Sequence, residues 1–390
     1  MPDRHTSSPE RPFLFDASRL VWRVWTGRLP TGIDRVCLAY MEHYGPRALA
    51  LVQRGELRLV LGPQHSDELF ALLRRGGKGF RLRLLALLAR AIIQRHRPRL
   101  AGMVYLNIGH TGLDALGLPG WVKRRKLRPV FLIHDLIPIT HPEFCRAGER
   151  ARHRARMRHA LDCAEGIIAN SAATLKAMES FAQTERYAMP GSLVAWLGAD
   201  EQVAPIERDP GEHPYFVIIG TIEARKNHLL LLHLWERLVE QLGAAAPRLM
   251  LVGQRGWEAD EVFALLDRSP RLKDHVLELG RCSDARMLAL LDGARALLMP
   301  SFIEGFGIPV IEALQRGTPV IASDLPVFRE IAGNIPLYLD PLDGQHWETA
   351  IRDFSGDCPE RARQLAAMPG FLAPDWAAHF ARVDHWLGAF

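Results

Sequence analysis

Short apolar runs recur along the chain, and each is followed by a stretch in which apolar residues return at helical spacing. The runs span three or four residues and, apart from Glu278 in one of them, contain no charged side chain. Runs of this length that are apolar throughout are typical of parallel strands buried between two layers of helices. We therefore predict an α/β fold with strands at 13–15, 104–106, 130–133 and 167–169 in the first half, and at 216–219, 249–252, 276–279, 296–298 and 319–322 in the second.

Two series of strands predict two doubly wound, Rossmann-like domains facing each other across a cleft, since 390 residues are many for one hydrophobic core. Residues 199–214 contain three prolines and no apolar periodicity, which is typical of a linker. Apolar residues recur at helical spacing from Trp376 to Leu387, which predicts a terminal amphipathic helix. The predicted boundaries are 1–199 for a basic N-terminal domain, 200–213 for the linker, 214–372 for the C-terminal domain and 373–390 for a helix that packs back on the body.

The composition excludes several classes of protein. Hydrophobic residues make up 48% and charged residues 24%, as in ordinary globular proteins. No apolar run reaches the roughly 20 residues that a spanning helix needs, and the N-terminus is polar and lacks an apolar signal core. We therefore expect a cytoplasmic protein. The five cysteines lie far apart and form no Cys-x-x-Cys pair, so neither a disulfide framework nor a zinc site is indicated.

Charge is divided unevenly between the two halves of the chain. Residues 1–198 contain 31 Lys and Arg against 16 Asp and Glu, and the remainder contains 18 against 28. From Leu69 to Leu113 there are nine basic residues and no acidic one. A helix in this segment would place Arg83, Arg90 and Arg97 on one face and Leu85, Leu88 and Ile92 roughly opposite. Further basic residues lie at 123–126 and at 150, 152, 154, 156 and 158.

This basic half indicates an anionic partner. Basic amphipathic helices bind anionic bilayers, so we expect the N-terminal domain to lie on the inner face of the cytoplasmic membrane, beside a lipid-linked acceptor. Two alternatives remain open. The arginine-rich helices can simply reflect the general amino-acid composition of the organism's proteins, with no binding partner. Alternatively, the basic surface can bind nucleic acid, although no recognised nucleic-acid-binding motif accompanies the charge.

The most informative stretch is 296–314, which follows a strand–loop–helix pattern. Gly305 and Gly307 allow the backbone to approach a ligand closely, and the free N–H groups at the start of the following helix can bind phosphate oxygens. Pro309 suits the first turn of that helix, where its missing N–H costs nothing. Glu304 and Glu312 are acceptors spaced to hold two hydroxyl-bearing parts of one extended ligand. The pattern therefore indicates a sugar nucleotide.

These residues resemble the family-4 retaining glycosyltransferases of the GT-B fold, whose signature is two glutamates separated by seven residues around such a turn. The resemblance implies that Glu304 contacts hydroxyls of the donor sugar and that Glu312 binds the ribose. It also assigns donor contacts to the loop residues Gly305, Phe306, Gly307 and Ile308.

Two other segments that follow predicted strands in the second half also resemble motifs of the family. Arg225 and Lys226 follow the turn at Gly220 and Thr221, and such adjacent cations can neutralise a departing diphosphate. Where the commonest family form has an arginine directly after the glycine, this chain has Thr221. The resemblance further implies that the loop at Arg281 and Cys282 reads the nucleobase.

In the first half, His134 and Asp135 directly follow a predicted strand, at its ligand-facing end. We expect His134 to hydrogen-bond the donor sugar or orient the acceptor, and Asp135 to fix the tautomer of His134 or position it. The alternative is a structural, capped His-Asp turn. Residues 31–35, including Gly32, resemble the family's first glycine loop. Residues 170–171 and 198–200 match its pattern too, although either can be a cap or a turn.

The resemblance implies a front-face displacement in which the leaving diphosphate accepts the acceptor's proton. Catalysis would then depend on positioning and on positive charge. No Asp-x-Asp metal motif occurs, so we expect no metal and no cofactor, with the nucleotide sugar as substrate. The donor is expected to be of the mannose type, as in bacterial envelope polysaccharide enzymes. A sugar-nucleotide epimerase or phosphorylase of related architecture is a rival, whereas a dehydrogenase is disfavoured because no strand is followed by Gly-x-Gly-x-x-Gly.

Overall fold

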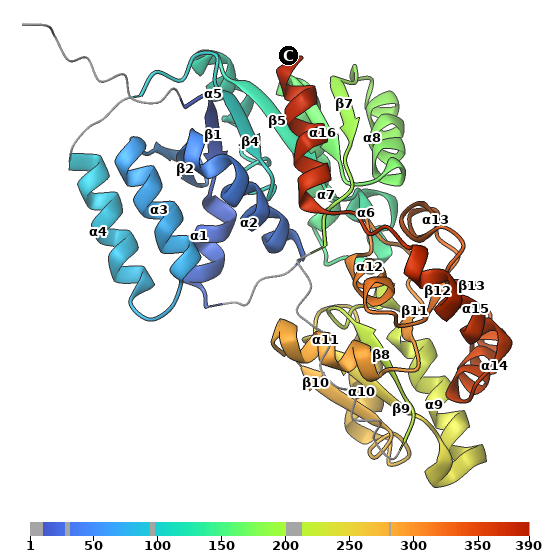
Figure 1. Ribbon diagram of the computed structural model, residues 1–390. Helices are drawn as coiled ribbons and strands as arrows, with labels where there is room; N and C mark the ends of the chain where they lie inside the picture. Colours follow the sequence, from blue (N-terminus) through green and yellow to red (C-terminus); the bar gives the residue numbers. More distant parts are fainter. Residues whose placement is uncertain (1–10, 28–31, 94–97, 200–212, 281, 390) are drawn as a thin grey trace, which may run out of the picture.

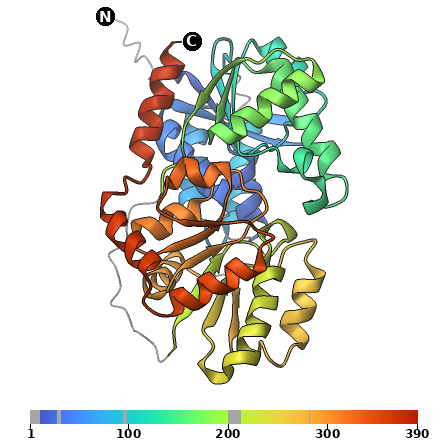
Figure 2. The same ribbon diagram turned by 90° about the vertical axis from the view of Figure 1, so that its right-hand side faces the viewer.

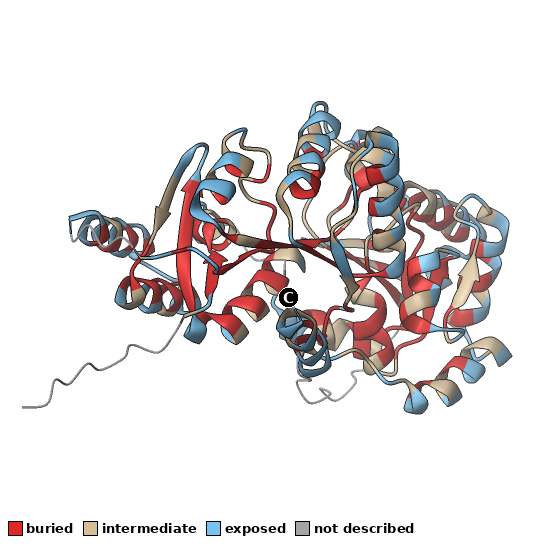
Figure 3. Ribbon diagram, turned by 90° about the horizontal axis from the view of Figure 1, so that it is seen from above, coloured by how far each residue is buried: buried red, intermediate tan, exposed pale blue. Residues whose placement is uncertain are grey.

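A computed structural model describes residues 11–27, 32–93, 98–199, 213–280 and 282–389. Within them the chain forms one seven-stranded and one six-stranded sheet, each covered by helices on both faces (Figure 1). The predicted α/β fold with two Rossmann-like domains is confirmed. The strands of both sheets are mostly buried, and the helices expose their outer faces (Figure 3). Within the described ranges, no helix is both long and apolar enough to span a bilayer.

The N-terminal sheet has the strand order β3-β2-β1-β4-β5-β6-β7, and all neighbours are parallel except β2 and β3. Its order reverses between β1 and β4, where the ligand crevice of a doubly wound sheet opens. The strands are β1 (Phe13–Asp16), β2 (Ala48–Arg54), β3 (Leu57–Val60), β4 (Val104–Asn107), β5 (Arg128–Ile133), β6 (Gly166–Ala169) and β7 (Gly191–Val194). The helices are α1 (Ser18–Trp25), α2 (Gly32–Tyr44), α3 (Pro63–Arg75), α4 (Phe80–Ile93), α5 (Leu118–Arg125), α6 (Ile137–Thr140), α7 (Glu149–Cys163) and α8 (Ala172–Glu185).

The C-terminal sheet has the order β10-β9-β8-β11-β12-β13 and is wholly parallel. Its crevice lies between β8 and β11, the strands that precede the two glycine turns. The strands are β8 (Tyr215–Ile219), β9 (Arg248–Val252), β10 (Val276–Gly280), β11 (Leu297–Met299), β12 (Val320–Ser323) and β13 (Leu337–Leu339). The helices are α9 (His228–Leu242), α10 (Asp260–Arg268), α11 (Asp284–Gly293), α12 (Ile308–Gln315), α13 (Pro326–Ala332), α14 (Gly344–Ser355), α15 (Pro359–Ala367) and α16 (Trp376–Gly388). Single 3₁₀ turns include η2 (Pro142–Phe144) and η3 (Ala224–Lys226).

The apolar runs form strands because both of their faces are buried. In β8, Phe216 and Ile218 pack into one core, whereas Val217 and Ile219 pack into the core on the opposite face of the sheet. Successive side chains of a strand point to opposite faces, so a strand buried on both sides is apolar at every position. The sheet is thereby held rigidly beneath the loops that follow it.

Helix α16 follows the last helix of the C-terminal sheet but lies against the N-terminal domain (Figure 2). Phe380 and Val383 are buried, and the hydroxyl of Tyr40 on α2 lies 2.8 Å from Nε2 of His379. Tyr44 also donates to Asp384 at 2.8 Å. The chain therefore crosses between the two sheets twice. The stretch 200–212, which makes up nearly all of the predicted linker, lies outside the described residues.

Candidate active site

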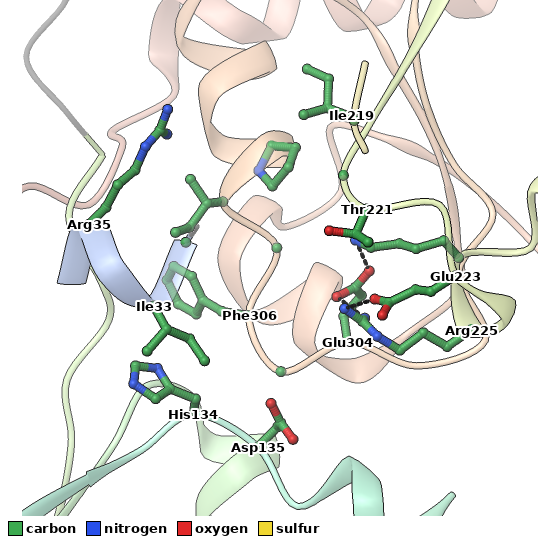
Figure 4. A pocket seen from close by; sticks show the side chains of 18 of the residues that line it. Ile33, Arg35, His134, Asp135, Ile219, Thr221, Glu223, Arg225, Glu304 and Phe306 are labelled. Atoms are coloured by element: carbon green, nitrogen blue, oxygen red, sulfur yellow. Dashed lines mark hydrogen bonds and ion pairs between the residues drawn. The ribbon is translucent and has the colours of Figure 1, made fainter. Parts of the chain in front are cut away.

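A cavity of about 600 Å³ lies between the two sheets, at the carboxyl ends of β1, β5, β8, β10 and β11 (Figure 4). Every residue predicted from the sequence to bind the donor or to catalyse lines this cavity, except Arg281, which lies outside the described residues. Residues separated by more than 150 positions thus meet in one place. The described members of this set are Gly32, His134, Asp135, Gly220, Thr221, Arg225, Lys226, Cys282, Glu304, Gly305, Phe306, Gly307, Ile308 and Glu312.

Glu304 lies at the centre of an ion-pair cluster in the β11–α12 loop. One carboxylate oxygen contacts Nζ of Lys226 and accepts from Ser301 Oγ at 2.8 Å, and the other lies 2.6 Å from Nη1 of Arg225. Nη2 of Arg225 in turn lies 2.6 Å from Glu223. The two cations predicted to meet phosphate are therefore already paired with two carboxylates.

Burial and charge act in opposite directions on this ion-pair cluster. Burial opposes ionisation of Glu304, but the charges of Arg225 and Lys226 outweigh it and lower the pKa of the carboxyl to about 2. For Glu223, burial has the larger effect and raises the pKa, although Arg225 and Lys226 lower it in part. Burial also disfavours the charge on Arg225, yet Glu304 and Glu223 raise its pKa above the usual range. Glu304 and Arg225 are therefore both ionised at neutral pH.

The two glycines of the loop are required by close packing. A methyl group at Gly305 would lie 2.4 Å from the carbonyl oxygen of His134, in the other domain. Gly307 has φ 109°, and a methyl group there would lie 2.7 Å from the ring of Phe328. Pro309 lies in the first turn of α12, as predicted. The turn thereby presents the N-terminus of α12 to the cavity, where its N–H groups can donate hydrogen bonds to an anion.

His134 faces the cavity from the end of β5 (Figure 4). Its Nε2 lies 2.8 Å from the carbonyl oxygen of Ile108, which can only accept, so Nε2 carries the proton. Burial lowers the pKa of His134 to about 4, with the Ile108 contact opposing the shift in part. At neutral pH the ring is therefore neutral, and Nδ1 is an acceptor suited to a sugar hydroxyl.

The prediction that Asp135 fixes the tautomer of His134 is wrong. The carbonyl of Ile108 fixes it, because the His134 side chain turns toward β4 and away from its neighbour in sequence. One carboxylate oxygen of Asp135 accepts from the backbone N–H of Ile137 at 3.0 Å and so closes a turn that leads into α6. Asp135 nevertheless lines the cavity, directly opposite Glu304 (Figure 4).

Two more histidines stand behind His134, and the sequence analysis missed both. The ring of His110 lies 5.2 Å from that of His134 and 6.0 Å from that of His153. Burial lowers the pKa of each. Nε2 of His153 lies 3.0 Å from the carbonyl oxygen of Asp135 and so supports the turn that carries the two cavity residues. Their positions in the sequence, on a loop and within a helix, give no signal of this contact.

Residues at the start of α8 join the two domains beside this turn. Asn170 donates through Nδ2 to the carbonyl of His134 at 2.9 Å, and Ser171 donates through Oγ to the carbonyl of Gly305 at 3.0 Å. Ser171 also caps α8. The stretch 170–171 is therefore both a helix cap and a bridge between the loops. In the stretch 198–200, Gly198 packs against the backbone of Trp376 and does not line the cavity, and Asp200 lies outside the described residues.

The opposite end of the cavity holds a second ion-pair group. Arg35 on α2 reaches across the cleft, where Nη1 lies 2.9 Å from Glu312 and Nη2 contacts Asp284. Glu312 is buried on α12. Gly32, one turn earlier on α2, packs beside Ile308. Arg35 was part of the predicted first glycine loop, but its contact with Glu312 was not foreseen. Thr31 of that loop lies outside the described residues.

Comparisons with known proteins agree with this geometry. A family model described as Glycosyl transferases group 1 matches residues 200–365. O-antigen chain mannosyltransferase B of Escherichia coli is 30% identical over 273 residues, which cover 64% of this chain and 68% of that protein. The chain belongs to the group 1 glycosyl transferases.

Relatives of this group 1 glycosyl transferase differ in length. The serotype-specific mannosyltransferase WbdA of Escherichia coli is 30% identical over 218 residues, which cover 52% of this chain but only 26% of WbdA. This chain therefore spans about a quarter of the length of that relative.

Solved structures share the two-domain fold of this group 1 glycosyl transferase. The structure of Alr3699/HepE of Anabaena in complex with UDP-glucose covers 97% of this chain with 99% of its own, at a TM-score of 0.69 and 16% identity. Sucrose-phosphate synthase of Thermosynechococcus elongatus covers 97% with 100% of its own chain, at a TM-score of 0.61 and 17% identity. At such identities the likeness shows the fold alone, and it confirms the GT-B architecture expected from the glutamate motif.

Proposed function

We propose that this group 1 glycosyl transferase is a retaining, metal-independent hexosyltransferase. It transfers a hexose, with mannose as the lead, from a nucleotide sugar to a lipid-linked or saccharide acceptor during synthesis of an envelope polysaccharide such as O-antigen, capsule or exopolysaccharide. One observation carries the proposal: Glu304, Arg225 and Lys226 face His134 and Asp135 across a cavity at the carboxyl ends of both sheets. The mannose lead rests on relatives described as mannosyltransferases.

The charges in the cavity suit the departure of a nucleoside diphosphate. In a front-face displacement, the bond from the anomeric carbon to the diphosphate oxygen breaks and a bond to the acceptor oxygen forms on the same face. The acceptor's proton moves to the departing phosphate oxygen. Arg225, Lys226 and the N-terminus of α12 would stabilise the negative charge that develops there. Neutral His134 would accept from a donor-sugar hydroxyl and hold the ring in place.

Metal independence is supported by the residues of the cavity. Two fixed cations stand where a divalent ion would otherwise compensate the diphosphate.

A donor panel tests the proposal. Thermal stabilisation and donor hydrolysis would be measured with GDP-, UDP-, ADP- and dTDP-sugars, using the wild type, Glu304→Ala and the exposed control Glu278→Gln. We expect one donor to stabilise the wild type and to be turned over, and we expect only Glu304→Ala to lose turnover. If no sugar nucleotide binds the wild type, the proposal is wrong and binding to an anionic surface becomes the leading alternative. Membership of the group 1 glycosyl transferases already disfavours the two alternative functions, a sugar-nucleotide epimerase and a nucleic-acid-binding protein.

Helix α4 supports the proposal that the acceptor is reached at a membrane surface. The helix forms an outer edge of the N-terminal domain (Figure 1), and Phe80, Leu84, Leu87 and Ala91 bury one side of it. The opposite side carries an exposed apolar stripe at helical spacing, flanked by Arg81 on one side and by Arg83 and Arg90 on the other. The large members of the stripe are Leu82 (75% exposed), Leu85 (53%), Ile92 (59%) and Ile93 (77%).

The basic surface is smaller than the sequence predicted. Arg97 lies outside the described residues, and Leu88 is half-buried beside the core rather than in the stripe. On α7, Arg154 and Arg158 both pair with Glu185. These pairs remove much of the free charge from α7. The proposed contact with an anionic leaflet therefore rests on the stripe of α4 and the arginines beside it, of which Arg90 also pairs with Glu68.

A further inference from the structure

Aromatic side chains from both domains border one end of the cavity. Phe144, at the end of η2, stacks on Phe302 of the β11–α12 loop with ring centroids 5.3 Å apart and parallel planes. The guanidinium of Arg146 lies 4.8 Å from the ring centroid of Trp257, which follows β9. Phe144 and Trp257 line the same cavity as Glu304. We call Phe144, Phe302 and Trp257 the aromatic rim.

The aromatic rim lies at the end opposite Arg35. The loop that carries Trp257 runs beside the turn at 221–223, where Ile222 donates to the carbonyl of Gln254 at 2.9 Å and forms a bridge with Arg255. Glu223 and Arg225 lie across the cavity from Arg35 (Figure 4). The nucleoside end of the donor would lie toward Arg35 and Glu312. Its sugar, where the reaction takes place, would then lie at the other end of the cavity, beside the aromatic rim.

Polar groups stand next to these rings. The carboxylate of Asp135, the buried carboxylate of Glu223 and the amide of Gln254 line the same part of the cavity. A pyranose presents an apolar face of C–H groups and a rim of hydroxyls. An aromatic face can cover the first, and carboxylate or amide oxygens can accept from the second. Neither feature suits a bare phosphate, which has no apolar face and is repelled by carboxylates.

We propose that Trp257 and Phe144 form the subsite for the pyranose ring of a saccharide acceptor, with its hydroxyls directed toward Asp135 and Glu223. The proposal rests on the proposed hexosyl transfer and names the acceptor's place in it. Because the aromatic rim is shared between the domains, the acceptor ring would touch both, and it would be held only while the cleft is closed. Arg146, stacked on Trp257, is a positioning residue for this face.

Methyl α-mannopyranoside is the probe for the test. Its binding would be followed by saturation-transfer NMR in the presence of the nucleoside diphosphate, and its KM would be measured in transfer from the donor. The variants are Trp257→Leu, Trp257→Phe, and Trp386→Leu as a half-buried control on α16. We expect Trp257→Leu to weaken glycoside binding and raise KM about tenfold, since a lost aromatic contact has roughly that effect. Trp257→Phe should recover most of the loss, and Trp386→Leu should match the wild type.

Donor hydrolysis separates the two proposals. If Trp257→Leu hydrolyses donor like the wild type and binds glycoside less well, both proposals are supported. If Trp257→Leu binds and uses glycoside like the wild type, the subsite proposal is overturned while transfer stands. If glycoside binding depends on Trp257 but no donor is hydrolysed or transferred, the subsite stands and the proposed function fails. Absence of any saturation transfer to the wild type would also overturn the subsite.

Discussion

Glu304 is the residue on which the ion-pair cluster depends. Its carboxylate compensates Lys226, which is nearly buried, and Arg225. We expect Glu304→Gln to lower kcat about 100-fold, because the fixed cations lose the charge that orients them at the diphosphate. The same change should destabilise the fold by about 3 kcal/mol, since a buried cation loses its partner. Donor hydrolysis and thermal unfolding measure the two effects.

The control for this prediction is Glu278→Gln. Glu278 pairs with Arg255 on the surface, so its loss should change stability by less than about 1 kcal/mol and leave kcat unaltered. Glu304→Gln with wild-type kcat would show that the ion-pair cluster is structural only.

The buried histidines predict a loss of stability on acidification. Burial lowers the pKa of His134 to about 4 and lowers those of His110 and His153 as well, so the unfolded chain binds more protons below the usual value of 6.5. Stability should therefore be full above pH 6.5 and fall between pH 6.5 and about 4, by up to about 1.4 kcal/mol per pH unit for each proton taken up. Below pH 4.5 the stabilisation from Glu304, whose pKa is depressed to about 2, is lost in turn.

Thermal unfolding midpoints between pH 7.5 and 4 provide the measurement. A midpoint that stays constant from pH 7.5 to 5 would contradict the prediction. His134→Gln should make the slope in this range shallower, because one proton fewer is taken up on unfolding.

The chemistry within one loop could be read from the sequence, whereas contacts between distant loops could not. Glu304, Gly305 and Gly307 stand in a single strand–loop–helix pattern, and local geometry dictates where they point. The partner of His134 is a backbone carbonyl just after a neighbouring strand, and that of Arg35 is a carboxylate in the other domain. Such pairs depend on how strands and domains are placed, which residue type and spacing do not encode.

At the scale of the element, most strands predicted from the sequence are buried on both faces, although the edge strand β10 is only partly buried. The prediction missed β3, β7 and β13, which are short strands at or near sheet edges and incompletely buried. It also missed β2, although this strand is apolar from Ala48 to Val52 and almost wholly buried. Burial on both faces leaves a continuous apolar run, but a half-buried edge strand leaves a mixed pattern that resembles a loop.

We predict from the exposed apolar stripe of α4 that the protein binds membranes. Liposomes with an anionic leaflet should bind the wild type in a salt-sensitive manner. We expect the double variant Leu85→Gln, Ile92→Gln to reduce partitioning at least about tenfold, because two exposed apolar side chains no longer enter the interface. Flotation of the protein with liposomes at low and high salt measures the effect.

Leu342→Gln is the matched control for α4. Leu342 is 79% exposed but lies in the C-terminal domain, so its replacement should leave flotation unchanged. Equal loss in both variants would point to general surface hydrophobicity, and no wild-type binding at any salt concentration would refute the membrane proposal.

At the scale of the whole molecule, the two domains meet through polar contacts as well as a shared core. Glu330 on α13 accepts from the backbone N–H of Ala172 at 2.8 Å and from Nε1 of Trp196 at 2.7 Å. Gly305 approaches His134 on the same side of the cleft. These contacts join the C-terminal domain to the side of the N-terminal domain on which α16 also packs. The pair of Arg35 with Glu312 closes the cleft from the other side.

From the pair of Arg35 with Glu312 we predict that donor binding is coupled to closure of the two domains. If Glu312 holds the ribose, Arg35 orients its carboxylate and keeps the N-terminal domain over the nucleoside. Arg35→Gln should raise the donor KM about tenfold with little change in kcat, because the contact is equally present before and during the reaction. Small-angle scattering should show a larger radius of gyration for this variant with donor bound. The surface control Arg74→Gln, which breaks a pair with the exposed Glu42, should change neither. A loss of kcat in Arg35→Gln at unchanged KM would instead place Arg35 in the chemical step and separate it from closure.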